Sequence, residues 1–314
     1  MKARTYFCRQ QGLSLIELMV ALVISLVIVI AASAFFLGSS RSRDTQDAAS
    51  LLQDNARFAT EVITRSIQQA GYQNYIWSSL GAASRREVSA PSDDEPDLRG
   101  YNNSAAGTST NNGTHNASAN RINNSDTLVA RFQGSSNASG ADGSMIDCMG
   151  RPLPEPDVLV TRYYSIFEVR QPSGTVEPEL RCKYATTTGG TLGFDTEPIV
   201  RGVESLQLLY GVDTNSDDVA DTWRNAEQVD NNGGGAVCSG TACITNWSRV
   251  RSVRVGMVLR SPTAVAVSSA SGTGTVAPLG AYFSQGIADT LTVSNTDGRL
   301  RKVVIFTVNV RNTL

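Results

Sequence analysis

The chain has 314 residues, of which 41% are hydrophobic and 18% charged, so it contains enough apolar material for a folded core. Its formal net charge is −2, and the body that follows the first twelve residues has 24 basic and 29 acidic residues. A mildly acidic body argues against binding to the phosphate backbone of nucleic acids, which requires clustered lysine and arginine.

Near the N-terminus, residues 18–37 form a run without a charge, a proline or a glycine. At about 1.5 Å per residue, an α-helix of this length spans roughly 30 Å, the thickness of the hydrocarbon core of a bilayer. Lys2, Arg4 and Arg9 precede the run, which predicts that the N-terminus stays in the cytoplasm. The alternatives are an ordinary single-pass anchor and a secretory signal peptide cleaved near Ala32-Ser33-Ala34, although signal peptides usually have a shorter apolar region.

A motif leads into this run. The segment Gly12-Leu13-Ser14-Leu15-Ile16-Glu17-Leu18-Met19-Val20-Ala21-Leu22 resembles the processing signal of type IV prepilins and pseudopilins. In that signal a short basic leader ends in glycine, a hydrophobic residue follows, and the fifth residue after the cut is glutamate. The resemblance implies that a prepilin peptidase cuts between Gly12 and Leu13 and methylates the new amine of Leu13. Residues 1–12, which include Cys8, would then be absent from the mature protein.

Glu17 stands at the head of the apolar run, where an unpaired carboxylate is costly. The cut creates a cation, the α-amine of Leu13. We expect the amine of one subunit to pair with Glu17 of its neighbour and so to set the axial register of bundled helices, because an unpaired buried charge is penalised. The alternative is that Glu17 is an interfacial residue favoured by the helix macrodipole.

Residues 38–70 are predicted to continue the helix with one apolar face. The apolar positions recur at spacings of three and four residues: Leu52, Ala56, Ala59, Ile63, Ile67 and Ala70. Gly71 predicts the end of the helix, and Gly38-Ser39-Ser40 is the place where a bend or local melting is expected. The expected organisation is a leader (1–12), a transmembrane half (13–37), an amphipathic half (38–70) and a head (71–314).

The head is predicted to be an antiparallel β-sheet packed on the second half of the helix, which makes the fold class α+β. Strands are expected from runs of alternating or continuous apolar residues: Thr127–Phe132, Val158–Arg170, Leu180–Tyr184, Val203–Val212, Val253–Arg260, Ala281–Ser284 and Val303–Val310. Residues 81–125 are interpreted as an irregular surface loop, because much of this segment is Asn, Ser and Gly. His115, the one histidine, lies in this loop, and we assign it no metal or catalytic role.

Four cysteines follow the apolar run and predict two disulfides, because a translocated domain meets an oxidising compartment. Four cysteines allow three connectivities. We favour Cys238–Cys243, which closes a short loop, and this leaves Cys148 with Cys182. The alternative is four free buried thiols.

An acidic segment in the head matches part of a calcium-loop pattern. Oxygen donors fall at the first, third, fifth, seventh and ninth positions of that pattern: Asp213, Asn215, Asp217, Val219 and Asp221. Asp218 stands where a glycine would make the sharp turn, and Arg224 stands where a bidentate glutamate would close the site. The alternative is an acidic hairpin turn, which Asp and Asn form readily.

Four segments of the body resemble the minor pilins of the PilW type in type IV pilus systems: Ile67–Tyr72, Val200–Asp213, Val253–Ser261 and Asn309–Asn312. The resemblance implies the pilin fold and a low-abundance subunit that joins other minor pilins in a priming complex. That complex would start growth of the major-pilin filament and support a tip-associated adhesin. The resemblance also implies an inner-membrane location with a periplasmic head, followed by a place at the pilus tip.

Three alternative functions agree less well with the sequence. A type II secretion pseudopilin shares the leader and the helix, so only the body segments distinguish it. A DNA-uptake pilin is disfavoured by the acidic head, although Arg249, Arg251 and Arg254 could form a local basic patch. An enzyme is disfavoured, because the sequence has neither a Gly-x-Ser-x-Gly motif nor a phosphate-binding loop nor a histidine cluster.

Overall fold

The structure is a computed structural model of the whole chain. It describes residues 14–74, 95–106, 115–116, 122–137, 139–154, 162–175, 177–188, 191–232, 238, 240–265, 272–280 and 290–312. Two compact units divide the chain, residues 1–47 and residues 48–314, and each is described by itself. The predicted leader, with Cys8, Gly12 and Leu13, lies outside the described residues.

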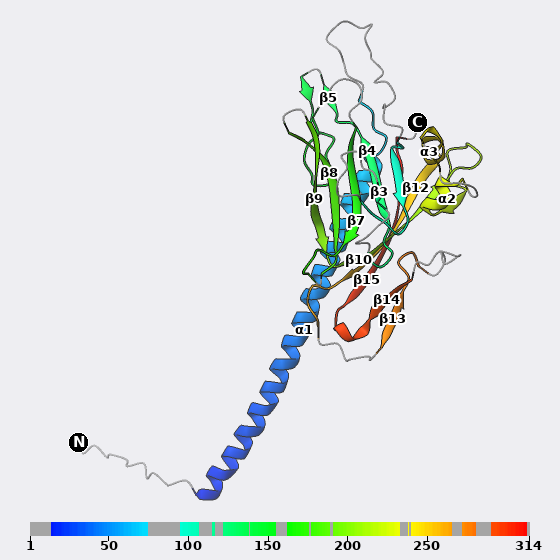
Figure 1. Cartoon of the computed structure of the whole chain (residues 1–314). Helices are drawn as coiled ribbons and strands as arrows, with labels where there is room; N and C mark the ends of the chain where they lie inside the picture. Colours follow the sequence, from blue (N-terminus) through cyan, green and yellow to red (C-terminus); the bar gives the residue numbers. More distant parts are fainter. Residues whose placement is uncertain are drawn as a thin grey trace. The chain divides into compact units, whose positions relative to one another are not determined.

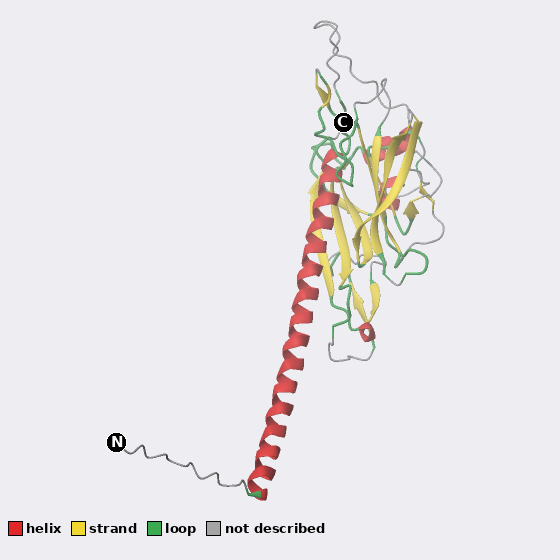
Figure 2. Cartoon of the chain, turned by 90° about the vertical axis from the view of Figure 1, so that its left-hand side faces the viewer, coloured by secondary structure: helices red, strands yellow, loops and turns green. Residues whose placement is uncertain are grey.

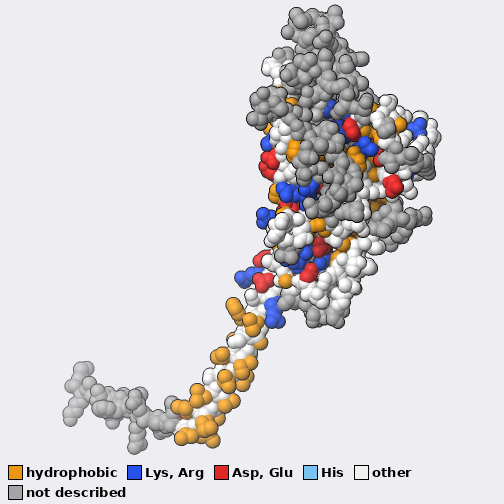
Figure 3. All heavy atoms as spheres, viewed as in Figure 1, with side chains coloured by type: hydrophobic (Ala, Val, Ile, Leu, Met, Phe, Trp, Pro, Cys, Tyr) orange, Lys and Arg blue, Asp and Glu red, His pale blue; other side chains and the backbone are white. Residues whose placement is uncertain are grey.

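The helix α1 runs from Leu15 to Gln69 (Figure 1). In the first unit its large apolar side chains, from Leu15 to Leu37, are between 52% and 79% exposed. Figure 3 shows these side chains as an apolar surface along this part of α1. By length and composition α1 could cross a membrane. The helix continues without interruption through Gly38-Ser39-Ser40, so the local melting expected there is absent.

In the second unit α1 buries one face. The buried side chains recur every three or four residues: Ala48, Leu52, Ala56, Ala59, Val62, Ile63, Ser66 and Ile67. All six positions predicted for the apolar face, through Ala70, are buried. The expected amphipathic half is therefore confirmed, and it contributes to the core of the head.

The larger sheet has five described strands in the order β1-β4-β7-β8-β9, and each neighbouring pair is antiparallel. These strands are β1 (Leu98–Tyr101), β4 (Thr127–Phe132), β7 (Tyr163–Arg170), β8 (Glu179–Thr188) and β9 (Thr191–Arg201). In Figure 2 the strands of the head lie beside the C-terminal part of α1. Buried residues of this sheet and of α1 belong to one hydrophobic core.

The second sheet has four described strands in the antiparallel order β11-β10-β12-β15. They are β11 (Thr222–Arg224), β10 (Val203–Val212), β12 (Val250–Arg260) and β15 (Arg301–Asn309). The alternation predicted for the last strand is confirmed, because Val304, Phe306 and Val308 pack on the core whereas Val303 and Ile305 are exposed. The fold is α+β, with a long helix packed on antiparallel sheets.

Shorter elements complete the described part of the head. Two short helices are α2 (Ala226–Asp230) and α3 (Thr241–Trp247). Three two-stranded sheets pair β2 (Ala105–Ala106) with β3 (His115–Asn116), β5 (Ser136–Asn137) with β6 (Gly140–Ala141), and β13 (Thr273–Val276) with β14 (Leu291–Ser294). A 3₁₀ helix, η2, follows at Asn295–Asp297.

The predicted strands compare with the structure in three ways. Thr127–Phe132 and Val203–Val212 have the predicted bounds, and most others are present with shifted ends. The expectation of an irregular segment at 81–125 is wrong at β1, where Leu98 is buried and pairs with Ala130 of β4, and at the short pair β2–β3. The predicted strand Ala281–Ser284 lies outside the described residues.

Candidate assembly site

Ser14 caps the N-terminus of α1. Its side-chain hydroxyl accepts a hydrogen bond from the backbone N–H of Glu17 at 3.2 Å. This satisfies one of the N–H groups that the first turn of a helix leaves without a partner. The sequence Ser14-x-x-Glu17 has the spacing of a capping box, a signal that identifies Ser14 as a candidate cap.

Glu17 lies in the first turn of α1, exposed, with exposed apolar side chains following it along the helix. The carboxylate is thus carried by an ordered helix, two residues after its first residue, Leu15. Gly12 and Leu13 lie outside the described residues, so the peptidase cut and the methylation remain predictions.

The opposite end of α1 is tied to the head by backbone groups. Gly71 takes a positive φ of 76°, which ends the helix. Its N–H donates to the carbonyl of Arg131 at 2.9 Å, and the carbonyl of Tyr72 accepts from the N–H of Gln133 at 3.0 Å. The side chain of Asn312 donates to two carbonyls of the last turn of α1. Two of the segments that resemble PilW-type pilins, near residues 70 and 310, therefore meet in space.

Both predicted disulfides are present. Cys148 is bonded to Cys182 on β8, with 6.5 Å between their Cα atoms, and Cys238 is bonded to Cys243 at the start of α3, with 5.0 Å. The first pair is buried in the core beside α1. The connectivity that we favoured from the sequence is the one that the structure has.

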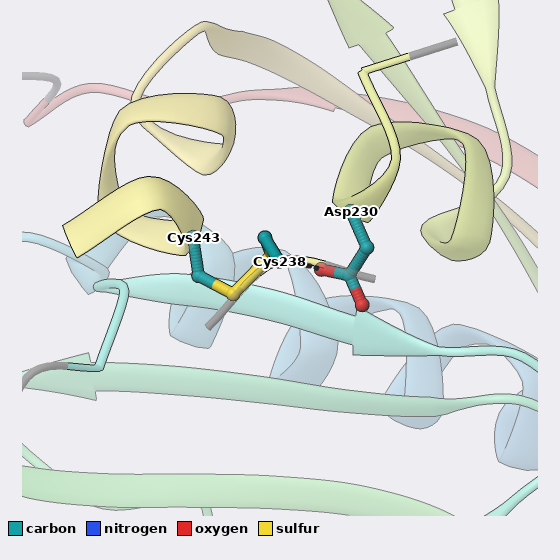
Figure 4. A group of neighbouring side chains, drawn as sticks. All are labelled: Asp230, Cys238 and Cys243. Carbon is teal, nitrogen blue, oxygen red and sulfur yellow. Dashed lines mark hydrogen bonds between the residues drawn. A yellow bond between two sulfur atoms is a disulfide. The ribbon is translucent and has the colours of Figure 1, made fainter. Parts of the chain in front are cut away.

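Asp230 at the end of α2 lies beside the second disulfide (Figure 4). Its carboxylate and the sulfur atoms of Cys238 and Cys243 lie within 4.8 Å of one another, as the ligands of a metal ion would. Because the two sulfur atoms are bonded to each other, neither is a thiolate that could bind a metal. The 3.2 Å approach of the Cys238 sulfur to Asp230 is likewise a contact without a donated proton. Asp230 instead accepts a hydrogen bond from the indole N–H of Trp247 at 2.6 Å.

In the acidic loop between β10 and β11, the predicted calcium ligands accept hydrogen bonds from the loop itself. Asp213 is buried, and it accepts hydrogen bonds from the backbone N–H groups of Asn215, Ser216 and Asp218. Although burial opposes its ionisation, these bonds, with help from Arg251, lower the pKa of Asp213. Among the described residues, no three acidic groups of this loop bring their oxygen atoms within 4.8 Å of one another.

The other predicted calcium ligands of this loop accept hydrogen bonds that stabilise the turn. Asp217 accepts from the N–H of Val219 at 2.9 Å, and Asp221 accepts from both the N–H and the hydroxyl of Thr214 at 2.7 Å. Asn215 accepts from the N–H of Asp217 at 3.1 Å. These hydrogen bonds are those expected of the alternative interpretation, an acidic hairpin turn whose side chains bond its own backbone, and calcium binding stays a prediction.

Two arginines of the possible basic patch, Arg251 and Arg254, contact other residues of the head. Arg251 forms ion pairs with Asp213 at 3.3 Å and with Asp218 at 2.8 Å. The guanidinium of Arg254 lies over the ring of Trp223, 4.3 Å from its centroid. The ion pairs of Arg251 offset its positive charge, which a phosphate-binding patch would need, whereas Arg254 keeps its charge.

Comparison with known proteins adds two sequence matches. Residues 8–33 match the prokaryotic N-terminal methylation motif, and residues 166–312 match the family described as Type IV Pilus-assembly protein W. No curated protein matches the chain significantly. Among solved structures, the chain is similar to a type IV-like pilin from Thermus thermophilus, with 13% identity and a TM-score of 0.41 over 83% of this chain and 97% of that one.

The methylation motif includes the start of the exposed apolar helix α1, and together with the α+β fold it indicates a protein of the type IV pilin class. The match over the head makes the assignment more specific. The match over residues 166–312, together with the methylation motif, supports a type IV pilin of the PilW type.

Proposed function

We propose that the chain is a minor pilin that enters a priming complex with other minor pilins and so initiates a type IV pilus. The observation that carries the proposal is Glu17, an exposed carboxylate in the first turn of an apolar helix and within the methylation motif of residues 8–33. A carboxylate at the edge of a bilayer needs a partner of opposite charge. The amine that the peptidase creates at Leu13 of a neighbouring subunit supplies one.

In this proposal a prepilin peptidase removes residues 1–12 and methylates Leu13, and the inner membrane holds α1 until assembly. The N-terminus stays cytoplasmic and the head is periplasmic. Apolar helices then bundle, and each pairing of an amine with Glu17 fixes the axial position of one subunit against the next. A misplaced subunit leaves a charge unpaired, which costs several kcal/mol. The major pilin extends the filament, and a tip-associated adhesin is the further partner that the head supports.

The proposal is tested in the host organism with the full-length chain. Mass spectrometry of the mature protein should find N-methylated Leu13 as its first residue. Glu17→Ala should be inserted and processed normally but should be missing from sheared pili and from complexes pulled down with other minor pilins, and Glu17→Gln should behave in the same way. Retention of Met1, cleavage at another site, or normal incorporation of Glu17→Ala would contradict it.

A further inference from the structure

The two larger sheets end in four edge strands in the described part of the head, and three of these strands are protected from pairing with another chain. β1 has four residues and β11 has three, which is short for a strand. β9 is long, but its Asp195, Glu197 and Pro198 are exposed, and charges and proline are the usual protection of an edge. The fourth edge strand, β15, lacks this protection over most of its length.

β15 has nine residues and lies at one side of the second sheet (Figure 1). Its residues 303–308 contain no charge, no proline and no glycine, and all of them are β-branched or aromatic. Val303 is 39% exposed and Ile305 is 45% exposed. A long, exposed and apolar edge strand of this kind is a template for a strand of another chain.

The backbone of β15 shows which of its groups face outward. The N–H of Val310 donates to the carbonyl of Arg251 on β12 at 2.9 Å. The carbonyl of Leu300 accepts from the N–H of Ser261 at 2.8 Å. Since the register between these points is continuous, the even-numbered residues of β15 bond to β12 and the odd-numbered residues turn their N–H and C=O groups away from it.

The outward backbone groups of β15 form what we call the free edge: Arg301, Val303, Ile305, Thr307 and Asn309. No strand in the described part of the chain pairs with this side of β15. The side chains of Val303, Ile305 and Thr307 are exposed as well. The free edge therefore offers a partner both ladder hydrogen bonds and apolar contact.

Positive charge without a partner lies at both ends of the free edge. Lys302 is the second residue of β15 and Arg311 lies two residues beyond its end, and among the described residues neither forms an ion pair. Arg301, in contrast, is paired with Glu204 at 2.7 Å and with Asp297. At about 3.3 Å per residue, the backbone positions of the two free cations are roughly 30 Å apart.

This charge pattern selects the occupant. Residues 301–312 contain no acidic residue, so the β15 strand of a second copy would leave the cations at both ends unpaired. A strand with a carboxylate near each end would pair with both of them. We propose that the free edge of β15 accepts one extended strand of another protein, in which alternating apolar residues are flanked at both ends by carboxylates.

The first experiment tests the backbone ladder with a synthetic peptide. Alternating valines and threonines, about as many as β15 has residues, are flanked at both ends by glutamates, and the peptide carries a fluorescent label. Fluorescence polarisation with the full-length chain in detergent should show saturable binding. The same peptide N-methylated at its central amides should bind at least about tenfold more weakly, because it cannot donate ladder hydrogen bonds. Equal binding of the two peptides, or no saturable binding at about 1 mM, overturns the proposal.

Variants of β15 locate the binding site. Ile305→Pro and Thr307→Pro each remove an outward N–H and leave the bonds to β12 in place, as proline at an edge does. Each should weaken binding of the unmodified peptide by about tenfold. Thr196→Pro on the protected edge strand β9 is the matched control and should bind like the wild type. Unchanged binding by both β15 variants would place the peptide elsewhere, and the comparison of the two peptides on the wild type needs no variant to fold.

Charge reversal tests the choice of occupant. The wild type should bind the glutamate-flanked peptide at least about fivefold more tightly than a lysine-flanked one, and added salt should reduce the difference. The Lys302→Glu/Arg311→Glu double variant should prefer the lysine-flanked peptide. The same preference in both proteins would show that these two cations do not select the partner.

The last experiment identifies the occupant in the host. A photoreactive amino acid replaces Val303 in the full-length chain, and the cross-linked segment is sequenced by mass spectrometry. We expect a segment of another protein with an apolar run between carboxylates, and we expect Thr307→Pro to abolish the cross-link. A cross-link to β15 of a second copy or to lipid, or no cross-link, contradicts the proposal. Because Thr307→Pro should keep N-methylated Leu13, this inference can fail while the proposed function stands.

Discussion

The side-chain amide of Asn312 donates hydrogen bonds to the backbone carbonyls of Gln68 at 3.2 Å and Ala70 at 3.1 Å. The last described residue of the chain thus closes the C-terminal end of α1. Carbonyls in the last turn of a helix have no partner within the helix, so these two bonds satisfy groups that would otherwise need water or a cap. The contact joins the end of β15 to the helix that carries the assembly residues.

We expect Asn312→Ala to lower the free energy of unfolding by about 1 kcal/mol, the usual value of such hydrogen bonds. Asn309→Ala is the matched control, because Asn309 is exposed on the neighbouring strand and should change stability by less than about 0.5 kcal/mol. Denaturant unfolding of the full-length chain in detergent, followed by tryptophan fluorescence, measures both. Equal effects of the two substitutions would show that Asn312 does not act as a cap.

Gly71 is required at the same junction for two reasons. Its φ of 76° is strained for other residues, and a Cβ at this position would overlap the backbone carbonyl oxygen of Asn312. We therefore expect Gly71→Ala to destabilise the head by more than the approximately 1 kcal/mol of a strained turn alone. Gly38→Ala is the control, because a Cβ there meets nothing within 4 Å and the site is helical, so it should be neutral or stabilising.

Gly100 on β1 and Tyr210 on β10 join the two sheets at close range. A Cβ on Gly100 would overlap the hydroxyl group of Tyr210, which is fully buried. That hydroxyl has no hydrogen-bond partner among the described residues, and burial raises the pKa of Tyr210 well above its ordinary value. A buried hydroxyl without a partner costs free energy, about 1 to 3 kcal/mol.

Tyr210→Phe should therefore leave the stability unchanged or raise it, which is unusual for a substitution in a core. Gly100→Ala should lower the stability, and part of that loss should be recovered in the Gly100→Ala/Tyr210→Phe double variant, because the ring then needs less space. A double-mutant cycle on thermal unfolding checks this. A loss of more than about 1 kcal/mol in Tyr210→Phe would mean that the hydroxyl has a partner.

The sequence predicted the parts of the fold that periodicity controls. The apolar face of α1 and strands such as Val203–Val212 are set by burial on one or both sides, and burial leaves a regular pattern. Strand β9 was missed because it is an edge strand: Asp195, Glu197 and Pro198 are exposed, and Pro198 is tolerated only where no ladder bond is needed. Edge strands of this kind resemble loops in composition.

Of the candidate site, too, one part could be predicted from the sequence and another part could not. Cys148 and Cys182 could be paired by elimination, whereas the fate of the acidic loop could not be predicted, because it depends on contacts far away in the chain. Asp213 is bonded by its own loop and by Arg251, which lies on β12. The hollow between Phe58 of α1 and Pro198 of β9 has no sequence signal either, since it exists only where the unpredicted strand β9 meets α1.

The stability of the head should depend on pH because of the contact between Asp297 and Arg301. The guanidinium of Arg301 donates hydrogen bonds to the carboxylate of Asp297 and thereby lowers the pKa of Asp297. The two residues form an ion pair at the start of β15. A lowered pKa means that the unfolded chain binds a proton at higher pH than the folded chain does. The contribution of this ion pair to the free energy of unfolding is therefore complete above the ordinary aspartate pKa of about 4. It is lost as the pH falls through the lowered pKa of Asp297.

We expect the melting temperature to fall on acidification below about pH 4, and to fall less steeply in Asp297→Asn, which has no carboxylate to protonate. The matched control is Asp54→Asn on the exposed face of α1, where the wild-type slope should be retained. Melting curves between pH 5 and pH 2 on the full-length chain in detergent compare the three slopes. A slope in Asp297→Asn as steep as that of the wild type would assign the acid sensitivity to other carboxylates.

The two disulfides should differ in how much they contribute to the free energy of unfolding. Cys148–Cys182 spans 34 residues and Cys238–Cys243 spans 5, so loop-closure entropy predicts losses of about 4 and about 2 kcal/mol when each pair is replaced by alanine. Denaturant unfolding of the full-length chain in detergent measures both losses. If the short bridge proved the more stabilising one, the contacts of α3 rather than chain entropy would determine its contribution.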